Sequence, residues 1–167
     1  MRHLFLVLTT LFLYSCTYGN KEQTDVLLYY NDFIVPIYNS KGEIIGEIMN
    51  NIEKDEFVIL SLNEISGNKA HVTAKYVFDD IFSITGYIQT KYLGIRTINS
   101  DSVFLYEFPS RDATIADTIL DANWTNIYRV TNVKQKWLYI EGCNEGRIIK
   151  GWLSPNDQCA DPVTIKC

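Results

Sequence analysis

Few residues of this chain could act as a nucleophile with a partner base. The chain has two histidines, and only His71 lies beyond the apolar run at its start. A Cys–His nucleophilic pair would have to join His71 to Cys143, Cys159 or Cys167. His71 lies in an alternating segment typical of a β-strand, where a histidine usually faces solvent or a neighbouring strand. A single histidine also falls short of the ligand set of most zinc hydrolases.

Carboxylates are the second group that could do chemistry. Asp79 and Asp80 are adjacent, and two acids held about 5–10 Å apart in a cleft can hydrolyse glycosidic bonds. Adjacent acids in a loop between strands usually point apart into water, however. The chain also has no calcium-loop spacing, no Gly-rich phosphate cradle and no nucleophile elbow. We therefore expect a protein that is not an enzyme, with no catalytic residue, metal site or cofactor.

Aromatic side chains are the remaining candidates for a binding surface. Phe, Trp and Tyr make up 13% of the chain, and flat rings with polar edges bind peptides and sugars by stacking combined with a hydrogen bond. The alternative is that these rings form the core or the seam between two parts of the chain. The candidates lie in predicted strands or adjacent turns: Tyr38, Tyr106, Phe108, Trp124, Trp137, Tyr139 and Trp152.

Short apolar segments separated by turn signals must position these rings. Segments of roughly four to seven residues, such as 33–38, 57–62 and 70–74, alternate with turns such as 39–42, 66–68 and 142–146. No segment keeps a helical stripe over three turns. The sequence therefore predicts an all-β protein of short strands.

The chain also repeats its own pattern. The matches share one order along the chain, with one length change in the loop of the last hairpin, where insertions and deletions are well tolerated. They join 35–38 to 103–106 and 69–72 to 137–140 at an offset of 68, and 86–88 to 151–153 at an offset of 65. Two consecutive β-units of about 60 residues follow, divided near residues 94–99.

The repeated unit resembles the bacterial Src-homology-3-like domain over most of residues 30–157. The segments that carry the resemblance are Pro109-Ser110, Trp137-Leu138-Tyr139-Ile140 and the closing stretches 86–93 and 151–154. The family's frequent Asn-Val-Arg first strand is absent from both copies. Lys69 stands where the first copy should carry the tryptophan that Trp137 supplies in the second. The resemblance implies two tandem small β-barrels, over residues 27–95 and 96–157.

The same resemblance implies a function. In Src-homology-3-like folds aromatic residues line the ligand groove, which makes Tyr106, Trp137 and Trp152 the expected ligand-binding residues. Many exported bacterial proteins that resemble this family are associated with the cell wall. We therefore expect a non-catalytic binding module for cell-wall peptide or glycan, or for a protein partner. The alternative is a structural or inhibitory protein whose twin units cap another protein.

The start of the chain predicts export. Arg2 and His3 give a basic start, residues 4–13 are almost wholly apolar, and small Ser15 precedes Cys16. The apolar run is shorter than the roughly 20 residues that cross a bilayer. The pattern resembles a bacterial lipoprotein box, which implies a signal peptide over residues 1–15, a lipid on Cys16 and a polar tether over residues 16–26. We expect a lipid-anchored protein on the periplasmic or cell-surface face of a bacterial membrane.

The charge of the chain argues against a nucleic-acid partner. The chain has a net charge of −5, and nucleic-acid binding requires clustered Lys and Arg. No polybasic segment follows Cys16, so lipid rather than charge must supply any membrane attachment. The expected partners are a membrane, through the N-terminal lipid, and peptidoglycan or a protein.

The remaining cysteines fit an oxidising compartment. Cys159 and Cys167 lie in the C-terminal tail (158–167) and bracket Pro162, which can help to reverse the chain. We expect a disulfide between them. The rival pairing of Cys143 with Cys159 or Cys167 stays open, because a sequence does not establish the geometry that a disulfide requires.

Overall fold

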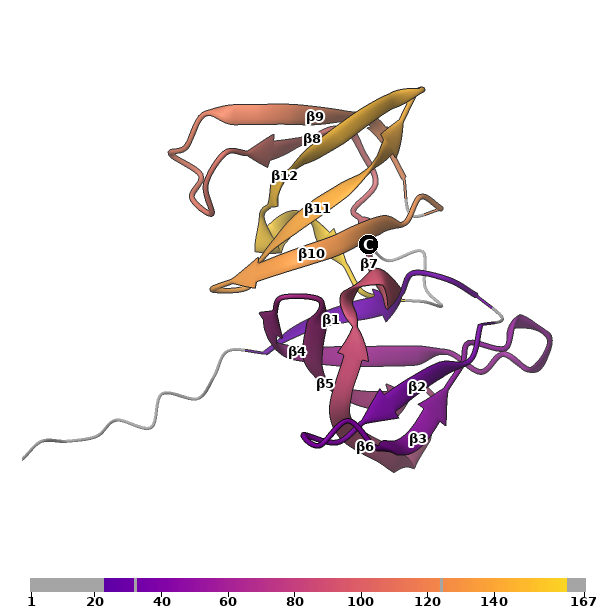
Figure 1. The fold of residues 1–167 in the computed structure, drawn as a ribbon. Helices are drawn as coiled ribbons and strands as arrows, with labels where there is room; N and C mark the ends of the chain where they lie inside the picture. The colour runs from indigo at the N-terminus through magenta and orange to yellow at the C-terminus, as the bar shows by residue number, and fades with distance from the viewer. Residues whose placement is uncertain (1–22, 32, 124, 162–167) are drawn as a thin grey trace, which may run out of the picture.

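The computed structural model describes residues 23–31, 33–123 and 125–161, which form antiparallel β-strands joined by turns and short 3-10 helices (Figure 1). The predicted all-β class is confirmed. The strands of the first half are β1 (Thr24–Leu28), β2 (Val35–Tyr38), β3 (Ile44–Ile48), β4 (Val58–Ser66), β5 (Lys69–Tyr76) and β6 (Asp79–Gln89). The remaining strands are β7 (Leu93–Thr97), β8 (Ser100–Tyr106), β9 (Ile115–Ala122), β10 (Tyr128–Lys134), β11 (Trp137–Asn144), β12 (Arg147–Leu153) and β13 (Gln158–Cys159).

Three 3-10 helices occur in this part of the chain: η1 (Ile52–Lys54), η2 (Thr90–Tyr92) and η3 (Pro155–Asp157). η2 follows β6 and η3 follows β12, so each half ends its last long strand in the same way. At η3, Ser154 Oγ accepts a hydrogen bond from the Asn156 amide at 3.3 Å, and Pro155 begins the helix. A serine cap followed by proline is a strong local signal for such a start, because proline has no amide hydrogen to satisfy there.

The strands are hydrogen-bonded in one path that does not close on itself. The order is β3-β2-β6-β5-β4-β1-β7-β10-β11-β12-β8-β9, and β13 pairs with β7 off this path. The all-β prediction therefore holds, while neither half of the described chain forms a closed hydrogen-bonded barrel. In Figure 1 the second half lies above the first, and β7 lies where they meet.

The strand order is mirrored about β1 and β7, and the pairing registers repeat. Val35 pairs with Ile48 as Val103 pairs with Ile119. Both β2–β3 and β8–β9 carry a register shift before the tyrosine that ends the first strand. Both β4–β5 and β10–β11 carry one in the middle of the hairpin. The repeat offsets found in the sequence thus recur in the hydrogen-bonding register.

β7 links the two halves. It pairs with β1 through Gly94 and Leu93, and with β10 through Ile95 and Gly94. The boundary predicted between residues 95 and 96 falls inside this strand. The buried cluster also draws on both halves, with Val26, Leu60 and Val72 from the first and Leu105, Ile140 and Leu153 from the second. The two halves therefore share one hydrophobic core.

Two glycines allow strands to cross closely at equivalent places. A Cβ on Gly86 would lie 2.5 Å from Ile37 Cγ2 and 2.6 Å from the Tyr38 carbonyl oxygen. A Cβ on Gly151, whose φ is +155°, would lie 2.8 Å from Leu105 Cβ. Because backbone cannot retreat like a flexible side chain, only glycine fits at these two crossings.

The two ends of the chain lie partly outside the described residues. Cys16, the predicted signal peptide, most of the predicted tether and Cys167 lie outside the described residues, and so does Trp124 in the middle of the chain. The predictions that concern them stay predictions. Cys159 is buried and is engaged in a disulfide, whereas Cys143 is a free, exposed thiol. A Cys143–Cys159 bridge is therefore not formed. Among the described residues no helix has the length and hydropathy needed to cross a membrane.

Candidate ligand-binding groove

A ladder of aromatic rings crosses the outer face of the second half. Tyr139 on β11 lies opposite Trp152 on β12, and Trp152 lies opposite Tyr106 on β8. The ring centroids of Tyr139 and Trp152 are 5.4 Å apart. Trp137 stands edge-on to Tyr106, with centroids 5.6 Å apart and planes at 87°. Tyr106, Trp137, Tyr139 and Trp152 are called the aromatic ladder below.

Strand alternation positions the ladder. Successive residues of a strand face opposite sides of the sheet, so Leu138 and Ile140 are fully buried while Trp137 and Tyr139 are partly exposed. On β12 the same alternation buries Leu153 and leaves Trp152 partly exposed. The rings therefore rest on the core with one side and reach solvent with the other.

A groove of about 380 Å³ opens beside the ladder. It lies between the β8–β9 hairpin and the outer face of β11 and β12, and it is named the ladder groove here. The residues that line it are Tyr106, Glu107, Ala116 and Asp117 from the first side, and Tyr139, Ile148, Lys150 and Gly151 from the second. At the edge of the groove Gly151 lets β12 approach β8 closely, because a Cβ there would lie 2.8 Å from Leu105 Cβ and 3.2 Å from the Tyr106 carbonyl oxygen.

Charges of both signs border the ladder groove. Asp117 Oδ1 lies 3.9 Å from Arg147 Nη1, and Glu141 accepts a 2.7 Å hydrogen bond from Arg129. Both pairs are solvent-accessible, so each contributes about 0–1 kcal/mol to stability. The side chains of Glu107 and Lys150 form no hydrogen bond or ion pair with another described residue, and both are exposed. The groove thus offers one unpaired carboxylate and one unpaired ammonium group to a ligand.

The structure brings together the three residues that the sequence nominates. Tyr106 lines the groove, while Trp137 and Trp152 pack against the lining residues Tyr106 and Tyr139. None of the three is buried, so the alternative of a purely internal core role does not apply to them. Their role in binding stays a prediction.

Sequence reasoning missed much of the lining. Of the lining residues, only Tyr106 and Tyr139 were among the aromatic candidates from the sequence. The charged residues Glu107, Asp117 and Lys150 had no comparable signal, because they come together only through the pairing of β8 with β12.

His71 lies in the first half, away from the candidate nucleophiles. It is the cross-strand partner of Tyr87, and the two ring centroids are 4.9 Å apart. Cys143 lies on β11, whose neighbours are β10 and β12, and Cys159 is engaged in a disulfide. The structure therefore assembles no Cys–His pair from these residues.

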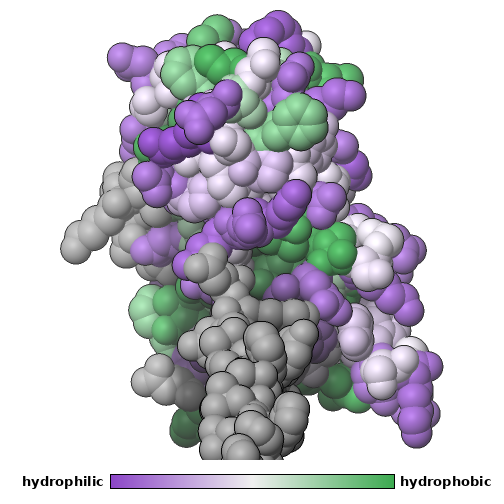
Figure 2. Space-filling view, turned by 90° about the vertical axis from the view of Figure 1, so that its left-hand side faces the viewer, coloured by the Kyte–Doolittle hydropathy of each residue, from purple (hydrophilic) through white to green (hydrophobic). Residues whose placement is uncertain are grey.

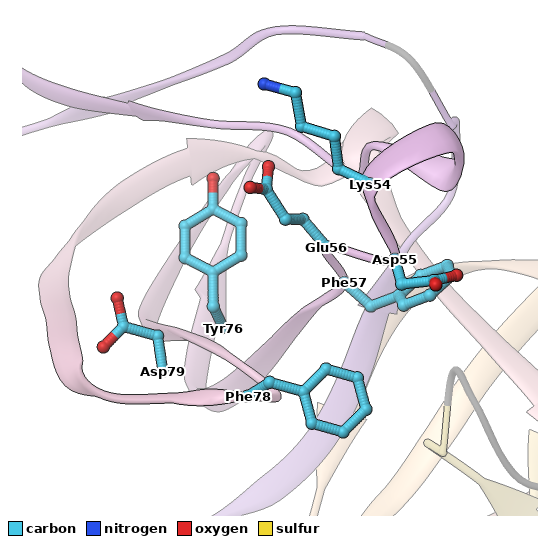
Figure 3. Close-up of a pocket in the computed structure, with 7 residues that line it drawn as sticks. All are labelled: Lys54, Asp55, Glu56, Phe57, Tyr76, Phe78 and Asp79. Carbon is cyan, nitrogen blue, oxygen red and sulfur yellow. The ribbon is translucent and has the colours of Figure 1, made fainter.

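A second cavity, of about 440 Å³, opens at the turn between β5 and β6 (Figure 3). The phenol of Tyr76 and the carboxylate of Glu56 lie on one side of it, and the ring of Phe78 lies on another. Asp79 Oδ1 accepts hydrogen bonds from the amides of Ile81 at 2.9 Å and Phe82 at 3.2 Å, so this carboxylate closes the turn. Within the described part of the chain, no three His, Cys, Asp or Glu side chains gather in a group that could hold a metal ion.

One face of the molecule is mixed in polarity. In the view of Figure 2, hydrophilic residues cover parts of both halves and hydrophobic residues form separate groups. Where it is not covered by grey atoms, this face thus presents no continuous apolar surface.

Comparisons with known proteins give few matches. No family model matches the sequence, and no curated protein matches it. Among solved structures, NlpC1 from Trichomonas vaginalis matches with 16% identity and a TM-score of 0.33, over 90% of this chain and 50% of that one. NlpC2 from the same organism matches with the same identity and TM-score, over 83% of this chain and 48% of its own. The chain thus spans about half the length of these structures.

These matches correct the prediction that the chain is not an enzyme. That prediction rested on the lack of a recognisable nucleophile and base in the sequence, whereas both matched structures are NlpC proteins. The exclusion of enzymatic activity therefore no longer stands. A TM-score of 0.33 transfers no activity and no residue role to this chain.

Proposed function

We propose that this protein is an exported, lipid-anchored binding module that recognises peptidoglycan through the ladder groove. The observation that carries the proposal is the aromatic ladder, in which four partly exposed rings from three strands lie beside a groove of about 380 Å³. Rings that rest on a packed core are held in place before the ligand arrives, so little conformational entropy is lost on binding.

The chemistry of the groove suits a sugar–peptide polymer. A ring face stacks against a sugar or an apolar side chain, and a tyrosine hydroxyl or tryptophan N–H adds a directed hydrogen bond. Glu107 and Lys150 add one group of each sign, which can bind amide, ammonium or carboxylate groups of a peptide. The resemblance of the repeat to the bacterial Src-homology-3-like domain supports the same assignment.

The anchoring part of the proposal rests on the N-terminal sequence. The basic start, the apolar run and Cys16 support lipid anchoring of the binding module at a membrane, next to the cell wall. A lipid on Cys16 would hold the ladder groove within reach of a ligand that is itself fixed in the envelope, so even weak binding would be effective.

Retention on purified, insoluble peptidoglycan tests the proposal. The chain carrying Cys16→Ser should be retained, and Trp137→Ala or Tyr106→Ala should weaken retention about two- to tenfold, the value of one lost aromatic contact. Phe78→Ala removes a ring that is 71% exposed but lies outside the ladder groove, and it should leave retention unchanged. Circular dichroism establishes that each variant is folded.

Two outcomes would contradict the proposal. The first is a folded wild-type protein that peptidoglycan does not retain. The second is an equal loss in the Phe78 and ladder variants. If crosslinking in cells instead captures one protein in stoichiometric amount, the alternative of a protein that caps a partner is the better description.

A further inference from the structure

The first half contains a groove beside the residues that are equivalent to the aromatic ladder. His71 on β5 lies opposite Tyr87 on β6, and Tyr87 lies opposite Tyr38 on β2. This register matches that of Tyr139, Trp152 and Tyr106 in the second half. A cavity of about 270 Å³ lies over Tyr38 and Tyr87 and is named the first-half groove here.

Its lining differs from the ladder groove in charge. Lys69 takes the place of Trp137, and Asn68 and Gln89 flank it, whereas no Asp or Glu lines the cavity. The ladder groove by contrast is lined by Glu107 and Asp117. The protein has a net charge of −5, yet this cavity has an ammonium group and no carboxylate in its lining, as does the cavity beside Lys91.

The polar groups of the first-half groove are not used by the fold. The side chains of Lys69, Asn68 and Gln89 form no hydrogen bond or ion pair with another described residue, and all three are exposed. The rings behind them are held in place, because Tyr87 packs against His71 at 4.9 Å between centroids and pairs with Tyr38. The groove therefore offers a cation, two amides and two phenol rings to a ligand.

We propose that the first-half groove is a second binding site, which takes a carboxylate-bearing sugar. The carboxylate pairs with the Lys69 ammonium, the Asn68 and Gln89 amides bind sugar hydroxyls, and the sugar ring rests on Tyr38 or Tyr87. The absence of an opposing carboxylate favours an anionic ligand, and the two amides favour a hydroxyl-rich one. The ligand class, a cell-wall glycan unit, rests on the proposed function, whereas the preference for a carboxylate rests on the groove alone.

Binding of small sugars, followed by nuclear magnetic resonance on the chain carrying Cys16→Ser, tests the site. N-acetylmuramic acid should shift the amide signals of Lys69, Tyr87 and Tyr38, and N-acetylglucosamine, which lacks the carboxylate, should bind at least twofold more weakly. Lys69→Gln should weaken binding of the acid about two- to fivefold, as expected for an exposed ion pair. Lys75→Gln, on the same strand but outside the cavity, is the matched control and should change nothing.

Several results would overturn the inference. Equal affinity for the acidic and the neutral sugar would remove the role of the carboxylate, and shifts confined to the aromatic ladder would remove the second site. Binding of a short glutamate peptide as tight as that of N-acetylmuramic acid would replace the sugar with an acidic peptide. Retention on peptidoglycan that depends only on Trp137 would leave the proposed function standing without this site. Binding of N-acetylmuramic acid at Lys69 without retention on peptidoglycan would support this site and contradict the proposed function.

Discussion

Tyr106 and Trp152 are direct cross-strand partners on β8 and β12, although β9, β10 and β11 separate them in the chain. Tyr38 and Tyr87 stand in the same relationship on β2 and β6. In both halves the pair lies at a crossing that a buried glycine makes possible, since Gly86 and Gly151 lie against the backbone of the tyrosine strand. The two aromatic pairs are therefore products of one local architecture that occurs twice.

Gly86→Ala and Gly151→Ala should destabilise the protein. At each site a Cβ would meet backbone atoms or a Cβ within 2.8 Å, and overpacking of this kind costs about 1–3 kcal/mol. Chemical denaturation should show a lower midpoint for both variants. Gly46→Ala is the control, because its Cβ would contact only the end of the flexible Ile84 side chain, which can move away. The loss of stability in this variant should therefore be smaller. A loss at Gly46 equal to that at Gly86 would refute the close-crossing argument.

Tyr128 should make the protein less stable at high pH. Burial raises the pKa of its phenol above the ordinary value of 10.0, and the nearby amides of Asn126 and Asn144 partly offset the rise. The folded state thus holds this proton to a higher pH than the unfolded state. The stability that this pKa shift contributes is fully present below the pKa of the phenol in the unfolded state. It is lost as the pH rises through the pKa of the phenol in the folded state.

The measurement is the free energy of unfolding of wild type and Tyr128→Phe from pH 8 to pH 11, a range chosen around that ordinary value. The wild type should lose stability above pH 10 relative to the variant, and the two should run parallel at lower pH. Parallel curves over the whole range would show that the phenol titrates alike in both states.

Cys16→Ser should release the protein from the membrane without unfolding it. The thiol is the predicted site of lipid attachment, and residues 4–13 are too short to span a bilayer. Fractionation of cells should place wild type in the membrane pellet and the variant in the soluble fraction, with the same circular dichroism spectrum for both. A variant that stays in the pellet and is processed like wild type would contradict the anchor.

Much of the fold was predictable because strand formation depends on local pattern. Alternation around His71 predicted β5, and the offset of 68 matched residues 35–38 to 103–106, where both halves carry the same register shift. The open path of strands was not predictable. It depends on β7, which serves both halves, and no local pattern specifies how many neighbours a strand has.

The sequence by itself determined the β-strands and the repeat, because periodicity is a local property. Its resemblance to the bacterial Src-homology-3-like domain pointed to the three aromatic residues Tyr106, Trp137 and Trp152. Only the tertiary structure decided that these rings lie together, partly exposed, beside Glu107 and Lys150. It also decided that Lys69 lies in a cavity without a carboxylate. The physical reason is that a groove is formed by strands distant in sequence, and its charge depends on which of them the hydrogen-bond register brings together.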